Sequence, residues 1–135
     1  MTLQYSVAVR NVRLDSVETA IGTSPIMEIR TGAPPANCAT ADSGTVLATL
    51  NLPSDWMAAA SGGTKAKSGT WQDASADNTG TAAHFRVKDS TGTTCHIQGT
   101  VTLTAGGGDM TVDNTSFVTA QTFTVTGFTL TAGNA

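Results

Sequence analysis

Aromatic and charged residues are scarce in this sequence, at 5% and 13% of its 135 positions. Because large apolar side chains supply most of the area that folding buries, a chain this poor in them should have a thin core. Oligomerisation, or docking on a larger surface, would offset that shortfall. Binding to a partner should not depend mainly on ion pairs, since each exposed pair contributes only about 0–1 kcal/mol.

The sequence also lacks a basic cluster, a long apolar run and a cysteine framework. Its net charge is −3 with seven scattered Lys and Arg residues, so DNA or RNA is not expected as a direct partner. No segment approaches the roughly 20 apolar residues of a membrane span, and residues 1–13 are too polar for a signal peptide. We therefore expect synthesis in the cytoplasm, where Cys38 and Cys95 would be free thiols, although one bridge between them stays open.

What the chain does contain is 25 threonines and 14 glycines, residues that favour strands and turns over helices. The predicted fold class is mainly β: an antiparallel β-sandwich or jelly roll of about seven or eight strands with one amino-terminal helix. We expect an amphipathic helix or arm over residues 1–22 and a single β-domain over 23–135.

Residues 82–103 give the clearest local prediction, a β-hairpin with strict alternation. A three-residue loop at 90–92, with Gly92 in the left-handed conformation, sets Val87 opposite Cys95 and Phe85 opposite Ile97. One face is then core, and the other is predicted to be solvated. The predicted solvated face carries His84, Arg86, Lys88, His96 and Gln98.

The amino-terminal helix is predicted over residues 3–21, ended by Gly22, with an apolar stripe at every third or fourth position. The stripe comprises Leu3, Val7, Leu14, Val17 and Ile21. Such a stripe must pack on something, either on the protein's own β-domain or, as an arm, on a neighbouring subunit.

Strands are predicted at residues 26–30, 45–52, 110–113 and 121–131, the last with a bulge at Gly127. Between the first two strands, residues 31–44 contain two prolines and no periodicity, which predicts a surface loop that is functional or ordered by a partner. Residues 58–69 are predicted to be a mobile loop, or an extended arm whose Lys65 and Lys67 meet an acidic neighbour. Trp71 should begin another strand.

No constellation of reactive residues is evident, so the sequence predicts no catalytic, cofactor-binding or metal-binding residues and no enzyme. His84 and His96 would be diagonal neighbours and would need a third metal ligand from elsewhere. Asp73 and Asp77 lie in a segment that lacks the Gly and the distant Glu of a calcium loop, so a solvated turn is expected. Cys38 has no accompanying base and is interpreted as a small buried anchor.

Four segments carry a resemblance to a known family: LQYSVAVRNVRLDSVETAIGTSP, LNLPSDWMAAASGGTKAKSGTWQDASAD, HFRVKDSTGTTCHIQGTVT and FTLTAGNA. Together they resemble small structural proteins encoded in the virion-morphogenesis modules of tailed bacteriophages and prophages. Within that context, a Thr- and Gly-rich β-protein with long loops is similar to capsid cement or decoration proteins, some of which have jelly-roll or sandwich folds. The resemblance assigns no role to individual residues.

The resemblance implies a non-enzymatic protein at the capsid surface of a virion, synthesised in the host bacterial cytoplasm. Its expected partners are the major capsid protein and further copies of itself as a homo-oligomer, with no nucleic acid and no membrane. The first hypothesis is a head cement protein that bridges and stabilises capsid subunits. The second is a tail, collar or fibre component that contacts other virion proteins or the host.

Overall fold

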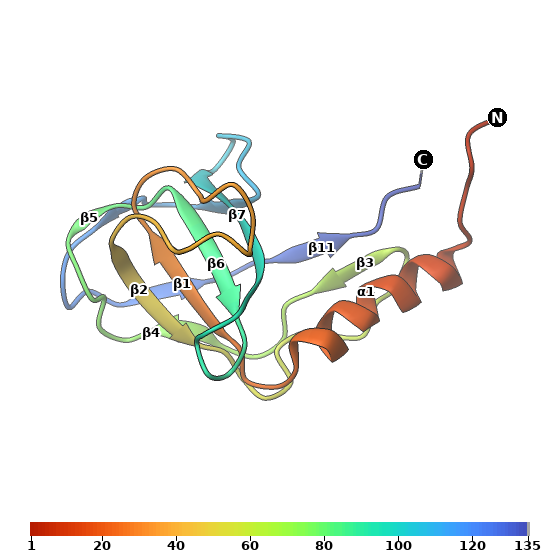
Figure 1. Ribbon diagram of the computed structural model, residues 1–135, viewed down its shortest axis with the longest axis horizontal. Coiled ribbons are helices and arrows are strands. Elements are labelled where there is room, and N and C mark those ends of the chain that lie inside the picture. Colours follow the sequence, from red (N-terminus) through yellow and green to blue (C-terminus); the bar gives the residue numbers. More distant parts are fainter. Residues whose placement is uncertain (135) are drawn as a thin grey trace.

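The computed structural model describes residues 1–134, so Ala135, the last residue of the predicted 23–135 β-domain, lies outside the described part. The protein is mainly β, with one helix, α1 (Val7–Ile21), followed by eleven short strands (Figure 1). The strand count is larger than predicted because the chain breaks expected long strands into short pieces that pair with different partners. The strands are β1 (Ile26–Arg30), β2 (Val46–Asn51), β3 (Thr64–Ala66), β4 (Trp71–Asp73), β5 (Gly80–Thr81), β6 (His84–Lys88), β7 (Cys95–Leu103), β8 (Met110–Val112), β9 (Ser116–Phe117), β10 (Phe123–Val125) and β11 (Thr129–Thr131).

Five strands form the main sheet in the order β2-β1-β6-β7-β8. All pairs are antiparallel except β7 and β8, which run parallel although only a short turn joins them. The turn is held by the Asp109 carboxylate, whose Oδ2 accepts hydrogen bonds from the Thr100 backbone N–H at 2.9 Å and hydroxyl at 3.0 Å. This side-chain anchor fixes the return of the chain alongside β7.

Three two-stranded ribbons complete the fold, pairing β10 with β4, β11 with β3, and β5 with β9. All four phenylalanines and both tryptophans are buried, so the few aromatic residues are concentrated in the core. Phe85 of the main sheet meets Phe128 edge to face at 5.7 Å between ring centroids, and Phe128 lies 5.3 Å from Trp71. Such pairs contribute about 0.5–1.5 kcal/mol beyond area burial.

The central hairpin forms with the predicted faces but a different register. Val87 pairs with Ile97 and Phe85 with Gly99, two residues away from the predicted partners, and a bulge follows Val87. Gly92 has the predicted left-handed backbone, with φ of +71°. The loop is longer than expected because the Asp89 carboxylate accepts from the Thr91 hydroxyl and the Thr93 N–H, which stabilises a wider turn.

Helix α1 begins later than predicted, since the Ser6 side chain caps it by accepting a hydrogen bond from the Val9 N–H at 3.3 Å. It ends as predicted at Gly22, whose φ is +89° and whose N–H donates to the Glu18 carbonyl. Only the second half of the predicted stripe is packed. Leu14 and Ile21 are buried and Val17 partly so, but Leu3 and Val7 are exposed.

The mobile loop predicted at residues 58–69 and the single strand predicted at residues 121–131 are wrong, whereas Lys65 does meet acidic residues, Asp15 and Glu18. Residues 58–69 contain a tight turn and β3, in which Lys65 is only 2% exposed, so this segment is part of the folded structure. The expected 121–131 strand is two strands, β10 and β11, which pair with different partners. Phe123, Val125 and Phe128 are nevertheless buried, as the pattern indicated.

The largest correction concerns the second face of the hairpin, because His84, Arg86 and Lys88 are buried and not solvated. Residues 31–44, here named the cover loop, lie across this face (Figure 1). Cover-loop carbonyls and Asp42 occupy the positions where water was expected. His96 is exposed as predicted, and Gln98 is half-buried with its amide donating to the Pro35 carbonyl at 2.6 Å.

Arg86 is the centre of this covered face, with 1% of its surface exposed. Its guanidinium donates to the carbonyls of Thr40 at 3.0 Å and Cys38 at 2.8 Å, and to Asp42 Oδ1 at 2.6 Å. Its Nε also donates to Cys95 Sγ at 3.2 Å. Asp42 Oδ2 additionally accepts from Lys88 at 2.6 Å and from Arg30 at 3.0 Å. The cover loop is therefore held by buried cations of the sheet.

We predict that Arg86→Met lowers the free energy of unfolding by about 2–4 kcal/mol, because Asp42 and several buried carbonyls lose their donor. The loss stays below that of a fully buried pair since Asp42 keeps about a third of its side-chain surface in solvent. Urea denaturation measures it. Arg13→Met, on the exposed side of α1, is the control and should change stability by less than about 1 kcal/mol; equal losses in the two variants would contradict the assignment.

Candidate functional site

The histidines singled out by the sequence do not form a site. His84 is completely buried, and its Nδ1 lies 2.7 Å from the Gly32 carbonyl, so that nitrogen carries the proton and Nε2 is left without a partner among residues 1–134. His96 points to solvent. Within the described part of the chain, no three His, Cys, Asp or Glu side chains are grouped to hold a metal ion.

The environment of His84 keeps its imidazole neutral. Burial is the main cause of its lowered pKa, and the charges of Arg30 and Arg86 act in the same direction, against the hydrogen bond to Gly32. A neutral, fully buried imidazole bonded to its own loop has no access to a substrate. His84 is thus a structural residue of the covered face.

The aspartates of the 73–77 segment serve their own fold. Asp73 Oδ2 accepts from the Thr49 N–H at 2.9 Å, and its Oδ1 accepts from the Ser75 N–H at 2.9 Å. Asp77 Oδ2 accepts from the Thr49 hydroxyl at 2.7 Å. These carboxylates tie the turn to β2, and the predicted solvated turn is found with Asp77 exposed and Asp73 partly buried.

The two cysteines, remote in sequence, are brought together by the cover loop. Both are half-buried free thiols, and both line the same cavity between the cover loop and the hairpin turn. Burial raises the pKa of Cys95 to about 11, and the Cys38 thiol adds to this, while Arg86 opposes it. Sequence reasoning missed this proximity because Cys38 lies in a segment without periodicity.

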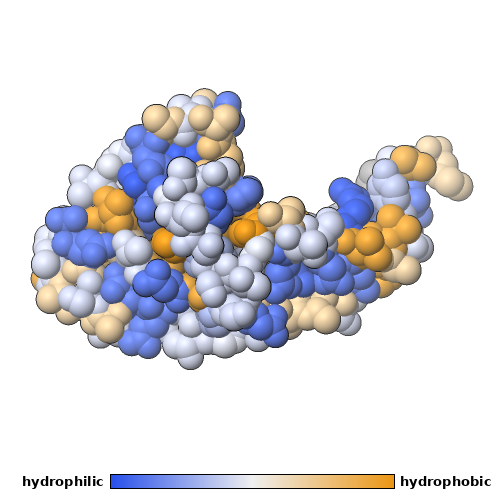
Figure 2. Space-filling view, turned by 60° about the horizontal axis from the view of Figure 1, so that its bottom comes forward, coloured by the Kyte–Doolittle hydropathy of each residue, from blue (hydrophilic) through white to orange (hydrophobic). Residues whose placement is uncertain are grey.

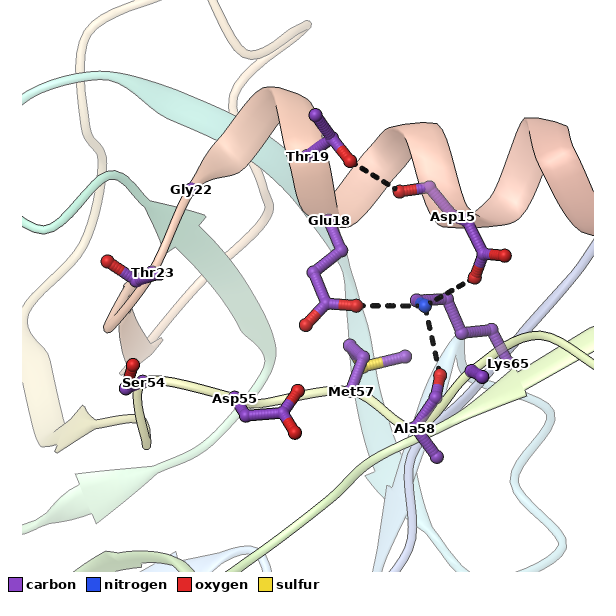
Figure 3. Close-up of a pocket in the computed structure, with 11 residues that line it drawn as sticks. Asp15, Glu18, Thr19, Gly22, Thr23, Ser54, Asp55, Met57, Ala58 and Lys65 are labelled. Atoms are coloured by element: carbon purple, nitrogen blue, oxygen red, sulfur yellow. Dashed lines mark hydrogen bonds and ion pairs between the residues drawn. The ribbon is translucent and has the colours of Figure 1, made fainter.

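A further buried cation, Lys65, lies beneath α1 in a cavity of about 540 Å³ (Figure 3). Its Nζ donates to Asp15 at 2.7 Å, to Glu18 at 2.8 Å and to the Ala58 carbonyl at 2.9 Å. Burial alone would lower the pKa of Lys65, but the hydrogen bonds to Asp15 and Glu18 raise it above its usual range. The amine is therefore a fixed cation and not a nucleophile.

Lys65 belongs to β3 and joins this strand to α1. Together with β11, which pairs with β3, these elements form a projecting part of the molecule, here named the arm. Figure 1 shows these elements extending away from the β body, with both chain ends near the arm's far end. Further bonds close the arm. Arg10 Nε donates to the Ala132 carbonyl at 2.6 Å, and Asn11 accepts from the Gly63 N–H at 2.9 Å.

Helix α1 packs through Leu14 and Ile21 and through the polar bonds just described, while apolar residues toward its amino-terminal end remain exposed. The exposed apolar residues, here named the arm face, are Leu3, Tyr5, Val7, Val9 and Val12. Val12 is 68% exposed although it sits in the middle of a regular helix. Figure 2 shows hydrophobic surface along the projecting arm. A group of exposed apolar residues at the end of a projection is typical of an interaction site.

The arm face can exclude water against an apolar surface. Among residues 1–134, no helix is long and apolar enough to cross a membrane. No protein-family model, curated protein or solved structure matches this chain.

We predict that acid destabilises the fold in two steps. Because the pKa of His84 is lowered in the folded protein, the unfolded chain binds more protons than the folded one as the pH falls below about 6.5. The free energy of unfolding therefore decreases below that pH. Burial alone would raise the pKa of Asp42, but Lys88 and Arg30 lower it, so its contribution is lost below about 3.8. Urea denaturation between about pH 8 and pH 3 measures both steps.

His84→Gln should flatten the first step, whereas His96→Gln, at an exposed position, should leave it in place. A wild-type free energy of unfolding that is equal at pH 8 and pH 5 would contradict the neutral, buried His84.

We predict that Lys65→Met loosens the arm, because Asp15 and Glu18 lose their shared cation and face an apolar side chain. Limited proteolysis should then cleave residues 1–22 several-fold faster than in the wild type. Lys67→Met is the matched control: Lys67 lies two positions along, and its amine donates to the exposed Gly69 carbonyl and lies 5.7 Å from the centroid of the Trp71 ring, with no partner on α1 in the described residues. Equal cleavage rates for wild type and Lys65→Met would show that Lys65 does not hold the helix.

Proposed function

We propose that this protein is a non-enzymatic structural component of a bacteriophage virion, most specifically a capsid cement or decoration protein that bridges and stabilises major capsid subunits. The observation that carries the proposal is the arm: a projection closed by its own ion pairs that presents the arm face outward. The virion context comes from the resemblance of the sequence to phage structural proteins.

The distribution of charge supports docking over chemistry. The cations that could serve as reactive or phosphate-binding groups, Arg86 and Lys65, are buried and occupied by the protein's own carbonyls and carboxylates. The neutral His84 is covered by the loop. What the described part of the chain leaves at the surface is largely threonine, alanine, glycine and serine, together with the arm face, a composition suited to contacts governed by shape and apolar burial.

The two long segments, residues 31–44 and 58–69, are not the docking surface. The cover loop already engages its own sheet, and residues 58–69 already form β3, so neither is available to drape over a neighbour. The arm takes that role instead. Each contact would be modest in area, but a lattice of identical sites multiplies weak contacts through effective concentration.

The proposal extends to fold and assembly. The curled main sheet and the β4–β10 ribbon, joined through Phe85, Phe128 and Trp71, would be the two layers of a reduced β-sandwich. The partners would be the major capsid protein and further copies of this chain as a homo-oligomer, on the capsid surface. A tail, collar or fibre component could use the same arm, and copy number separates the two. A cement protein is present in hundreds of copies, a tail part in tens or fewer.

We predict that Val12→Glu reduces retention on heads at least about tenfold, because docking would bury an unpaired carboxylate. Val118→Glu is the matched control, since Val118 is a similarly exposed valine, at 58% against 68%, outside the arm. Quantified gels of purified particles measure retention. Equal retention of the two variants would exclude the arm face as the docking surface.

Particles that lack the protein should assemble but lose DNA at a lower temperature than complete particles. Retention of the wild type should change little up to about 0.5 M NaCl, where exposed charges are screened within a few ångströms. Heads that are equally heat-resistant without the protein would remove the cement role and favour the tail or fibre alternative.

A further inference from the structure

Cys38 and Cys95 belong to different elements that the covered face brings into contact. Cys38 lies in the cover loop, and Cys95 is the first residue of β7. One guanidinium fixes both positions, since Arg86 Nη2 donates to the Cys38 carbonyl at 2.8 Å and Nε donates to Cys95 Sγ at 3.2 Å. Arg86 therefore holds the cover loop at Cys38 beside the start of β7 before any bond forms.

The pair is also accessible from outside. Both cysteines line an open cavity of about 360 Å³ between the cover loop and the hairpin turn, together with Thr93, Thr94 and Arg86. Both side chains are half-buried. A small disulfide can therefore reach the thiols without unfolding of the loop.

We propose that Cys38 and Cys95 form an oxidation-sensitive clasp, in which a small-molecule disulfide converts the two thiols into one bond between the cover loop and β7. A Cys38 thiolate attacks one sulfur of the small disulfide, and the first small thiol leaves. The Cys95 thiolate then attacks the mixed disulfide at Cys38, and the second small thiol leaves. Two electrons pass to the small molecule, whose S–S bond breaks, and its two released thiols take up the protons that the cysteines lose.

The raised pKa of Cys95 sets the rate of closure. Burial raises the pKa of Cys95, so little of it is thiolate at neutral pH, and closure should accelerate as the pH rises. A reducing cytoplasm thus leaves the clasp open, and a more oxidising medium closes it slowly.

The clasp adds a covalent link where Arg86 already binds the loop non-covalently. Its biological use, hardening a particle after release from the cell, rests on the proposed function, whereas the thiol chemistry does not. The two can fail independently, because the test of the clasp uses the purified protein alone.

The test incubates folded protein with oxidised glutathione and follows mass, linked peptides and thermal unfolding. We expect the mass to fall by two hydrogen atoms, a single peptide linking Cys38 to Cys95, and a rise in Tm of about 5–10 °C that dithiothreitol reverses. Closure should be faster at higher pH. Cys38→Ser is the control: it should fold, form no internal link and show no oxidant-dependent rise in Tm.

Three results would overturn the clasp. The first is stable glutathione adducts on either cysteine, and the second is disulfide-linked dimers as the main product. The third is that both thiols stay reduced in the folded protein and are oxidised only after the protein is unfolded in urea.

Discussion

The buried guanidinium of Arg86 is the interaction on which the rest of this structure depends. A cation in a dry interior is stabilised only if its donors are all satisfied, and the cover loop supplies backbone carbonyls together with one carboxylate of Asp42. The same Asp42 bridges to Lys88 and Arg30. Glu28 of β1 also pairs with Arg30 and Lys88. The cover loop and Glu28 together satisfy these cations, which lets a chain with few aromatic residues bury both sides of its central strands.

The arm also contains a buried cation that other groups of the same chain satisfy. Lys65 is buried beneath α1 and satisfied by Asp15, Glu18 and one carbonyl, so a polar contact adds to the packing of Leu14 and Ile21. Only the second half of α1 is packed, and the apolar residues toward its amino-terminal end remain exposed. The feature that suggests docking thus follows from the way in which the helix is attached.

Sequence patterns predicted the parts of the fold that depend on alternation and on special backbone conformations. The strand at residues 26–30, the left-handed Gly92, the end of α1 at Gly22 and the burial of Phe123 and Phe128 are confirmed. The hairpin register was wrong by two residues because alternation specifies which face a side chain takes, and a shift of two preserves the faces.

The covered face and the arm could not be predicted for a different reason. The groups that satisfy Arg86 are mainly backbone carbonyls of a loop without periodicity, and carbonyls are the same in every residue. The burial of Lys65 likewise depends on partners in α1, about 50 positions earlier in the sequence. Charged residues in an alternating strand are ordinarily solvated, so their burial here is a tertiary effect that the local pattern does not contain.

The most direct test of this account is the mobility of the cover loop in the isolated protein, measured by ¹⁵N relaxation. If the sheet's own cations order the loop, the amides of residues 37–43 should have order parameters near those of β1 and β6, about 0.85. Order parameters below about 0.6 in the loop, with a rigid sheet, would show that the loop awaits an external partner and that the buried layer does not hold it.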